Sequence, residues 1–484
     1  MTAIYSLVPV PFLIIALALV ARRMRPFVCV ASLLMWLQVG VAATVCLPHM
    51  AAGSAPLASG GLRLDAVGSL FVVLNTVVVA SALAHAVGFF AREAEGAHGP
   101  SMRALREFYV FAALFLLSMY AVVVADNVGY LWIAVEATTL LSAPLVYYHR
   151  SHTALEATWK YLIICSVGIA FAFVGTAMLY SASQRVPMLG DGSLSLTALS
   201  GHARALPHGL LRLAFVFVLL GYGTKAGLFP LHSWLPDAHS EAPAPASAML
   251  SGALLNCALV ALWRISRLMA DAGEEAFVQA TLLPMAVVTV LAASLLMLRQ
   301  RDLKRLLAYS SMENVGVMAA AVALGVGSGF ALQAANHSLV KTALFLLAGN
   351  LLQRYGTKSI RQLQGVMCDQ AAQGILLLLA AVAVAGTPPF GSFLAEWQIL
   401  AAAADGRHIA TVAIVCVALA VAFVGLAVQV GGVVFGDPLP AGREERGGAG
   451  ASTLAVPAAM VMASLVLGTM LTPKLIALVA GFGR

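Results

Sequence analysis

The stretch Gly221-Tyr-Gly-Thr-Lys225-Ala-Gly-Leu-Phe-Pro230 places one lysine inside an apolar segment that glycines and a proline interrupt. Proline lacks a backbone N–H and leaves carbonyls of the preceding turn without partners. In lipid, such a break is tolerated only against other protein segments or internal water. A lysine at mid-membrane costs about 2.5–3.5 kcal/mol on insertion scales. The stretch therefore predicts a broken membrane helix that carries an ion site.

A second interrupted segment reads Gly386-Thr-Pro388-Pro389-Phe-Gly391-Ser-Phe-Leu-Ala-Glu396. Here glycine and two prolines break an apolar run shortly before a glutamate. A kink beside a buried charge favours an ion site over simple packing. The two segments predict two related sites in one membrane-embedded fold.

The composition also requires a lipid environment. Of 484 residues, 61% are hydrophobic and only 10% are charged, whereas roughly a quarter of the residues in a soluble domain are charged. The first apolar segment, Leu7 to Val20, is followed by Arg22, Arg23 and Arg25 and by no small-residue cleavage site. This pattern favours a first membrane anchor over a removed signal peptide. We therefore expect an all-α, multi-pass membrane protein.

Hydropathy predicts about fourteen transmembrane helices, since one span needs about 20 apolar residues. The predicted spans are 4–21, 27–47, 64–90, 107–125, 127–148, 155–182, 208–230, 241–265, 278–298, 303–323, 329–352, 372–402, 408–434 and 453–480. The segment 436–452 is rich in Gly, Arg and Glu and is predicted to be a solvated linker.

The distribution of basic residues orients these spans. With the N-terminus outside, sixteen of the 28 Lys and Arg residues fall in inside loops and nine fall outside; the remaining three, Lys160, Lys225 and Lys341, fall within predicted helices. Because basic loops favour the cytoplasmic side, we expect a bacterial-type inner (plasma) membrane with both termini outside, in the periplasm. The net charge of +7 is spread over these loops, so it indicates the lipid bilayer and no nucleic acid as a partner.

No cofactor site is evident in the sequence. The six cysteines form no CxxC pair, whereas a metal or iron–sulfur site needs clustered ligands. We therefore expect no cofactor bound by this chain and no catalytic centre of its own.

Ionisable residues recur inside the predicted spans. They are Glu136, Lys160, Lys225, Glu313, His337, Lys341 and Glu396. A structural ion pair could explain any one of them, but the whole set favours a polar proton path through the membrane. His337 and Lys341 are spaced i, i+4 and share one helix face. An imidazole and a desolvated lysine can both exchange protons near neutral pH.

Polar residues also gather after Pro236, where Asp237, His239 and Glu241 follow one another closely. They form either a polar entrance on the inside face or only a cap for the next helix. The sequence leaves both interpretations open.

The two interrupted helices are the seventh and the twelfth. This separation is expected if helices 4–8 and 9–13 are two copies of one unit, and an odd number of helices per copy makes the copies inverted. Glu136 and Glu313 then lie on equivalent helices, as do Lys160 and Lys341. The predicted regions are an N-terminal three-helix region at 1–106, a first five-helix repeat at 107–270, a second, inverted repeat at 271–436, and a linker with the C-terminal helix at 437–484.

Four motifs resemble the antiporter-like subunits of respiratory complex I, a family that includes subunits of multisubunit sodium/proton antiporters and membrane-bound hydrogenases. The motifs are Trp132-Ile-Ala-Val-Glu136-Ala-Thr-Thr-Leu, Lys225-Ala-Gly-Leu-Phe-Pro-Leu-His-Ser-Trp-Leu-Pro-Asp-Ala-His239, Asp302-Leu-Lys-Arg-Leu-Leu-Ala-Tyr-Ser-Ser311 and His337-Ser-Leu-Val-Lys341-Thr-Ala-Leu-Phe345. The resemblance runs over nearly the whole chain. Glu156-Ala-Thr-Trp-Lys160-Tyr and Ser311-Met-Glu313-Asn314 look most similar to component F of hydrogenase 4.

The resemblance implies a role for each residue of the path. Glu136 and Lys225 would form a pair that sets the proton affinity of the lysine. His337 and Lys341 would form the central relay, and Glu396 would match the helix-12 site. The residues of a secondary path would be Lys160, Asn256, Glu313, His232, Asp237 and His239.

One position departs from the family. Asn256 stands where the family often has a lysine, and an amide cannot exchange protons, so water or direct transfer from Lys225 would have to bridge it. The chain also ends at Arg484, so we expect no long lateral helix of the kind that extends some members.

The resemblance implies a proton-translocating membrane subunit of a hydrogenase-4-like or complex-I-like redox complex. Other membrane subunits would be its partners and would carry iron–sulfur clusters, with nickel–iron or quinone as further candidates. Two alternatives stay open: a subunit of a multisubunit sodium/proton antiporter without redox coupling, and a structural, non-conducting membrane subunit. We likewise leave open whether the complex is an enzyme.

Overall fold

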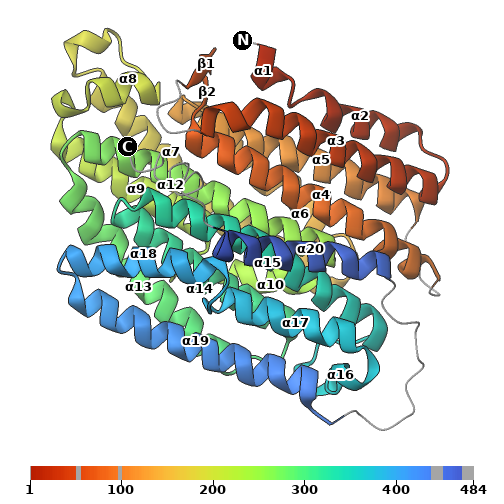
Figure 1. Cartoon of the computed structure of the whole chain (residues 1–484). Coiled ribbons are helices and arrows are strands. Elements are labelled where there is room, and N and C mark those ends of the chain that lie inside the picture. Colours follow the sequence, from red (N-terminus) through yellow and green to blue (C-terminus); the bar gives the residue numbers. More distant parts are fainter. Residues whose placement is uncertain (1, 51–55, 96–100, 438–450, 471–484) are drawn as a thin grey trace.

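A computed structural model of the chain describes residues 2–50, 56–95, 101–437 and 451–470. These residues are nearly all helical, as predicted, and the one sheet among them is a two-stranded hairpin. Eleven of the described helices are long and apolar enough to cross a membrane. They pack side by side as a bundle (Figure 1). This arrangement is that of a multi-pass membrane protein.

The helices and strands follow the order of the chain (Figure 1). The N-terminal part contains α1 (Thr2–Tyr5), α2 (Pro9–Val20), α3 (Met24–Met50), β1 (Leu57–Ser59), β2 (Leu62–Leu64) and α4 (Ala66–Glu95). The middle part contains α5 (Met102–Val124), α6 (Val128–Val146), α7 (His152–Ser183), η1 (Pro187–Leu189), α8 (Leu196–Gly201), η2 (Ala203–Ala205), α9 (His208–Ala226), α10 (Trp234–Glu241), α11 (Ala244–Met249), η3 (Leu250–Leu254) and α12 (Leu255–Asp271). The last part contains α13 (Glu275–Met297), α14 (Leu303–Ala323), α15 (Gly327–Tyr355), η4 (Ile360–Gln362), α16 (Val366–Asp369), α17 (Ala371–Val384), α18 (Gly391–Asp405), α19 (Ile409–Phe435) and α20 (Ala451–Thr469).

Both predicted helix breaks are confirmed in place. Gly227 follows the last residue of α9 and has φ +80°, and the chain becomes helical again in α10. Gly386 lies two residues beyond α17 and has φ +68°, and α18 follows it. Glycine adopts this left-handed conformation without the steric cost of a Cβ atom, so each glycine can end its helix.

Different helices cover the two breaks. At the first, the backbone N–H of Phe229 donates to Thr289 Oγ1 of α13 at 3.0 Å. At the second, Gly468 of α20 packs so closely that a Cβ atom there would lie 2.0 Å from the Pro389 carbonyl oxygen. α20 therefore closes the second break as α13 closes the first.

The helix after the first break contains an irregular turn that the sequence did not predict. α11 continues into the π-helical segment η3, and η3 continues into α12. π-helical turns are rare and are often found at functional sites. This turn lies within the longest fully buried span of the described chain.

Two matched backbone contacts support the predicted inverted repeat. Asn127 caps α6 and pairs with Ser195, whereas Asp302 caps α14 and pairs with Ser359. The first pair lies at the end of the bundle that holds β1, β2 and α8, which we call the outer end after the predicted orientation. Since successive helices alternate in direction, the second pair lies at the opposite, inner end, which holds the α2–α3 and α6–α7 connections. Equivalent features at opposite ends are expected of inverted copies, although the repeat itself remains a prediction.

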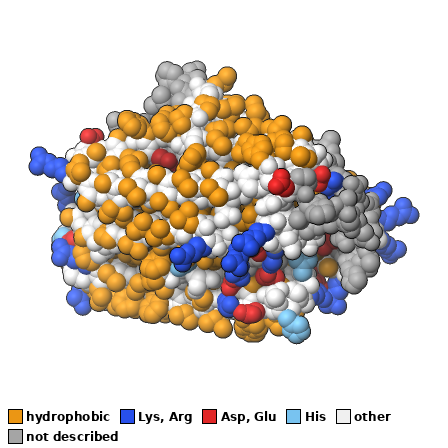
Figure 2. All heavy atoms as spheres, turned by 90° about the horizontal axis from the view of Figure 1, so that it is seen from below, with side chains coloured by type: hydrophobic (Ala, Val, Ile, Leu, Met, Phe, Trp, Pro, Cys, Tyr) orange, Lys and Arg blue, Asp and Glu red, His pale blue; other side chains and the backbone are white. Residues whose placement is uncertain are grey.

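The lateral surface of the bundle is apolar. Exposed side chains include Trp159 and Ile163 on α7 and Val417 and Val428 on α19. Figure 2 shows hydrophobic side chains over broad areas of one face, with charged side chains gathered in separate groups. Such a surface matches lipid or neighbouring apolar helices.

Several sequence predictions remain untested by this architecture. The total of fourteen spans and the four regional boundaries stay predictions. Most of the predicted linker at 436–452 and residues 471–480 of the last predicted span lie outside the described residues. The question of a lateral C-terminal helix falls outside them as well.

Candidate proton-conducting axis

Lys225 lies fully buried in the last turn of α9, two residues before the first break. Its Nζ donates to Tyr161 Oη at 2.7 Å and to Thr139 Oγ1 at 2.8 Å. It also lies 4.6 Å from the centroid of the Tyr161 ring. The two hydroxyls and the ring replace part of the hydration that an ammonium group loses on burial. The site can therefore hold a lysine as a proton carrier.

Glu136, which the resemblance pairs with Lys225, makes no direct ion pair with it in the described structure. Its Oε1 accepts a hydrogen bond from Ser166 Oγ at 2.9 Å, and its Oε2 is buried without a hydrogen-bond partner. Thr139 lies one turn further along α6 and binds the lysine. Glu136 and Lys225 therefore make no direct contact. They are linked through Thr139, which lies on the same face of α6 as Glu136.

In the middle of the bundle, α12 meets α15 through Asn256. The Asn256 Nδ2 donates to Ser338 Oγ at 2.8 Å and to the Gly252 carbonyl at 3.2 Å. Beside it, His337 Nε2 lies 3.1 Å from the Ser251 carbonyl in the π-helical turn. The Asn256 amide therefore lies directly against α15, the helix that carries His337 and Lys341.

Serine hydroxyls extend this contact to α14. Ser251 Oγ lies 2.8 Å from Ser311 Oγ, and Ser311 Oγ donates to the Leu307 carbonyl at 2.9 Å. The same carbonyl accepts a hydrogen bond from Lys341 Nζ at 3.1 Å. A continuous set of polar groups thus joins His337 to Lys341, both of which are fully buried.

Beyond Lys341 the axis continues through carboxylate and amide groups. Glu313 is buried on α14 and acts electrostatically on Lys341. Its Oε2 accepts from Asn314 Nδ2 at 2.7 Å, and Asn314 Oδ1 accepts from Gln333 Nε2 at 2.8 Å. These amides bring the polar axis from α14 back to α15.

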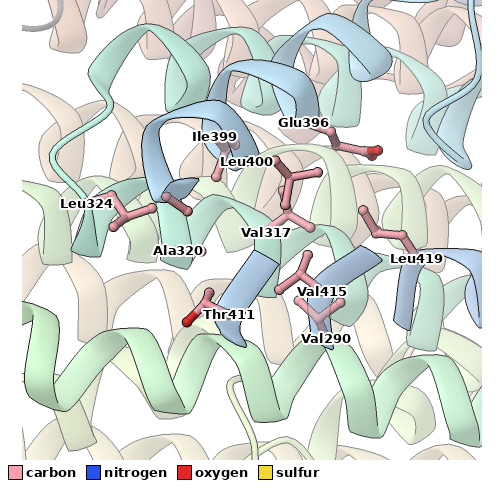
Figure 3. Close-up of a pocket in the computed structure, with 11 residues that line it drawn as sticks. Val290, Val317, Ala320, Leu324, Glu396, Ile399, Leu400, Thr411, Val415 and Leu419 are labelled. Atoms are coloured by element: carbon pink, nitrogen blue, oxygen red, sulfur yellow. The ribbon is translucent and has the colours of Figure 1, made fainter. Parts of the chain in front are cut away.

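Glu396 lies on α18, next to the second break. Its side chain is 7% exposed, and Oε1 is buried without a hydrogen-bond partner. Apolar side chains such as Val317, Leu400 and Leu419 line the pocket beside it (Figure 3). A Cβ atom at Gly386 would lie 2.1 Å from Glu396 Oε2. The glycine of the break therefore makes room for the carboxylate.

The expectation that Lys160 is buried is wrong. Its side chain is 47% exposed and forms ion pairs with Glu156 at 2.7 Å and with Asp237 at 3.2 Å. Asp237 also pairs with Arg305 at 2.6 Å. Hydropathy locates a residue along a helix but not around it, and a long lysine can direct its charge out of the bundle. Lys160 and Asp237 thus belong to a surface network at the inner end.

A pocket of about 430 Å³ opens at the inner end beside Glu241, Lys304 and Lys358. Lys358 Nζ lies 2.6 Å from Glu241 Oε1. Burial raises the pKa of the Glu241 carboxyl, but hydrogen bonds from Lys358 and Thr153 outweigh burial and lower the pKa overall. Lys304, in the first turn of α14, is buried and donates to the Ala242 carbonyl.

The two histidines near the first break have different surroundings. His239 is fully buried, stacks on Phe345 with ring centroids 4.9 Å apart, and has no hydrogen-bond partner for either ring nitrogen among the described residues. It lies within electrostatic reach of both Lys304 and Lys341. His232 is half-buried and stacks on Phe229. The position of His239 favours the entrance interpretation over helix capping.

The structure therefore unites most of the predicted site. Lys225, Asn256, His337, Lys341, Glu313 and Glu396 are all buried, and we call this set the axis, whereas Glu136 is half-buried at the α6 face and Lys160 and Asp237 lie at the inner surface. Sequence reasoning missed Tyr161, Thr139, Ser251, Ser311 and Gln333, because a hydroxyl or amide within a helix carries no motif. Among the described residues, no group of three or more His, Cys, Asp or Glu side chains could hold a metal ion.

Comparison with known proteins gives a consistent set of relatives. The family described as NADH:quinone oxidoreductase/Mrp antiporter, TM, matches residues 125–421. The chain is 37% identical over 395 residues to a hydrogenase-4 component F homolog of Methylacidiphilum infernorum, covering 78% of this chain and 81% of the relative. It is 30% identical over 398 residues to NADH-quinone oxidoreductase subunit N of Desulforudis audaxviator, covering 79% of this chain and 77% of that one.

A solved structure matches the fold over its full length. A chain of the membrane-bound sulfane sulfur reductase, an archaeal respiratory membrane complex, superposes with a TM-score of 0.85 at 25% identity. The match covers all of this chain and 97% of that chain. The fold is therefore shared along the whole molecule.

Proposed function

The chain belongs to the NADH:quinone oxidoreductase/Mrp antiporter family, and from this premise we propose that it is a proton-translocating membrane subunit of a hydrogenase-4-like or complex-I-like redox complex. The observation that carries the proposal is the buried axis from Lys225 through His337 and Lys341 to Glu396. Charged groups inside a membrane protein are costly and mark ion or proton pathways.

The chemistry of the axis favours protons over sodium as the transported ion. Lysine and histidine carry a proton by covalent bonding to nitrogen and present a positive charge when protonated. A sodium ion binds instead to several oxygen ligands and is repelled by ammonium groups. Two of the titratable groups in the middle of the axis, His337 and Lys341, are nitrogen bases.

In this proposal the partners are other membrane subunits of the complex. They carry out electron transfer while this chain moves protons. A relative in a respiratory membrane complex supports such an assembly. Iron–sulfur clusters, and nickel–iron or quinone, would belong to those partner subunits. The excess of basic residues in the inner loops supports an inner membrane location with both termini outside.

A second candidate is a subunit of a sodium/proton antiporter that works without redox chemistry. The family description names Mrp antiporters, which favours this candidate. A structural, non-conducting subunit is the third candidate, and Asn256 favours it because an amide cannot carry a proton. The intact set of lysines and glutamates along the axis favours conduction instead.

The decisive experiment is proton flux into vesicles that hold the purified complex, wild type against Lys225→Ala, with and without sodium. We expect redox-driven, sodium-independent acidification in the wild type and its loss in the assembled variant. The matched control is Arg103→Ala, which removes an exposed charge. Sodium-dependent flux without electron transfer would establish the antiporter, and unchanged flux in Lys225→Ala would leave the structural role.

A further inference from the structure

Three buried aromatic rings lie together near the outer end of the bundle. Trp263 on α12 stacks on Phe330 on α15, with ring centroids 5.6 Å apart. Phe330 contacts Phe71 on α4, with centroids 5.5 Å apart. All three side chains are almost completely buried. We call Phe71, Trp263 and Phe330 the aromatic cluster.

The position of the cluster is tied to the proton axis by helix geometry. Trp263 follows Asn256 by seven residues on α12, and Phe330 precedes His337 by seven residues on α15. Seven residues are close to two helical turns, so each ring lies on the same helix face as its axis residue, about 10 Å further along. α12 runs toward the outer end and α15 runs away from it, so both steps lead outward.

The third ring also lies toward the outer end, but by only one helical turn. Phe71 precedes Asn75 by four residues on α4, which also runs away from the outer end. The Asn75 Nδ2 donates to Cys257 Sγ, next to Asn256, at 3.3 Å. On all three helices, the aromatic cluster therefore lies closer to the outer end than the axis does.

A polar pocket of about 300 Å³ lies on the other side of the cluster. Its lining includes Arg63, Asp65, Trp263, Arg264, Arg267 and Asp271. Trp263 thus belongs both to the aromatic cluster and to the pocket wall. The charged residues make the pocket polar.

Two of the arginines line the pocket next to Trp263. Arg264 is 8% exposed, its guanidinium donates to the Ala125 carbonyl at 2.6 Å and to the Val123 carbonyl, and its Nε has no hydrogen-bond partner among the described residues. The Arg267 guanidinium lies 5.8 Å from the centroid of the Trp263 ring, a distance typical of a cation–π contact. Asp271 is exposed at the pocket and has no hydrogen bond or ion pair among the described residues.

We propose that this pocket is a proton outlet to the outer side and that the aromatic cluster is the gate between it and the axis at Asn256 and His337. Apolar constrictions block conduction by excluding water, and the three buried rings form such a constriction between the axis and the pocket. The inference rests on the proposed function. It adds a site of proton release and the residues that close it.

Of the three rings in the cluster, only that of Trp263 also lines the pocket. Movement of this ring therefore opens the gate. Arg267 holds the ring from the pocket side. When the ring is displaced, water joins the axis to the pocket, and a proton leaves through it past the exposed Asp271. The closed cluster prevents protons from returning between turnovers.

The test uses the purified complex in vesicles with an imposed pH gradient and no redox substrate, so that only leak is measured. We expect Trp263→Ala and Phe330→Ala to raise passive proton flux about tenfold, equal to removing about 1.4 kcal/mol from a barrier. Trp263→Phe keeps an aromatic ring and should not leak. The matched control is Phe108→Ala, which removes an equally buried ring that packs on Phe90 away from the axis.

The route of the leak is tested by combining Trp263→Ala with Lys341→Ala, which should return the flux to the wild-type level. No leak in the assembled variants overturns the gate, and so does an equal leak in Phe108→Ala or a leak that survives Lys341→Ala. If Trp263→Ala does not assemble, Phe330→Leu replaces it with the same expected leak. Redox-driven flux of the wild type in the same vesicles reports on the proposed function separately.

Discussion

Lys225 and Lys341 are equally buried in two halves of one axis, yet their ammonium groups have different surroundings. Lys225 donates to two side-chain hydroxyls and lies over an aromatic ring. Lys341 donates to one backbone carbonyl, and the buried Glu313 lies within electrostatic range. The first lysine is thus held by the hydroxyls of neutral side chains, and the second by a backbone carbonyl in the neighbourhood of a carboxylate.

This difference indicates a division of labour along the axis. Neutral hydroxyls around Lys225 keep their number of protons, so the affinity of this lysine changes only when a distant charge such as Glu136 changes. At Lys341 the buried Glu313 lies within electrostatic range, and the charge of either group affects the proton affinity of the other, because charges interact strongly in a low dielectric. Three substitutions can break or sharpen this comparison.

The largest effect is expected from the carboxylates. The resemblance pairs Glu136 with Lys225 and so ranks Glu136 above Glu313, but burial favours the opposite order, because Glu313 is buried whereas Glu136 is half-buried and its charge is more strongly screened. We expect Glu313→Gln to lower redox-driven proton flux about tenfold, and Glu136→Gln only about threefold, for barrier changes of about 1.4 and 0.7 kcal/mol. Flux into vesicles measures both, and a greater loss in Glu136→Gln would restore the ranking from the sequence.

An intermediate effect is expected at Tyr161. Tyr161→Phe removes one of the two hydroxyl acceptors of Lys225 and leaves the other, Thr139, in place. We expect lower flux and a lower midpoint of thermal unfolding in detergent. Tyr109→Phe is the control, because the Tyr109 hydroxyl is buried without a hydrogen-bond partner. Equal changes in both variants would mean that the hydroxyl of Tyr161 has no special role.

The smallest effect is expected outside the membrane, where Glu274 connects the two halves between α12 and α13. Arg212 donates to it at 2.7 Å, and this hydrogen bond, opposed by burial and assisted by His208, lowers the pKa of the Glu274 carboxyl. A lowered pKa in the folded protein stabilises the folded state at pH values above the ordinary glutamate pKa of about 4.3. The stabilisation is lost as the pH falls through the lowered pKa.

Glu274→Gln should therefore lower the midpoint of thermal unfolding at neutral pH, with proton flux unchanged. The difference from the wild type should shrink as the pH falls below about 4.3, where the carboxyl becomes protonated in the unfolded state, and should vanish below the lowered pKa of the folded state. Glu107→Gln serves as the comparison, since its ion pairs with Arg103 and Arg150 lie on the surface. A difference that persists undiminished in acid would show that the Glu274 charge is not responsible.

The sequence predicted the location of the charges better than their contacts. Apolar runs interrupted by glycine and proline predicted the two helix breaks, and Lys225 and Glu396 lie beside them. Such a break leaves backbone groups unpaired, so in lipid it is tolerated only where protein or internal water covers it. The burial of Lys160 was predicted wrongly, since hydropathy does not distinguish the two faces of a helix. The π-helical turn and the contact of Asn256 with Ser338 depend on packing between distant helices, which no local pattern records.

The close approach of Gly468 to the second break has a consequence for how the protein is made. A chain leaves the ribosome with its N-terminus first, so α13, which covers the first break, is synthesised soon after it. The helix that covers the second break, α20, follows only after α19 and the segment behind it. Glu396 and its neighbours therefore acquire their final surroundings last, and a nascent chain stalled before α20 carries a finished first half beside an unfinished second one.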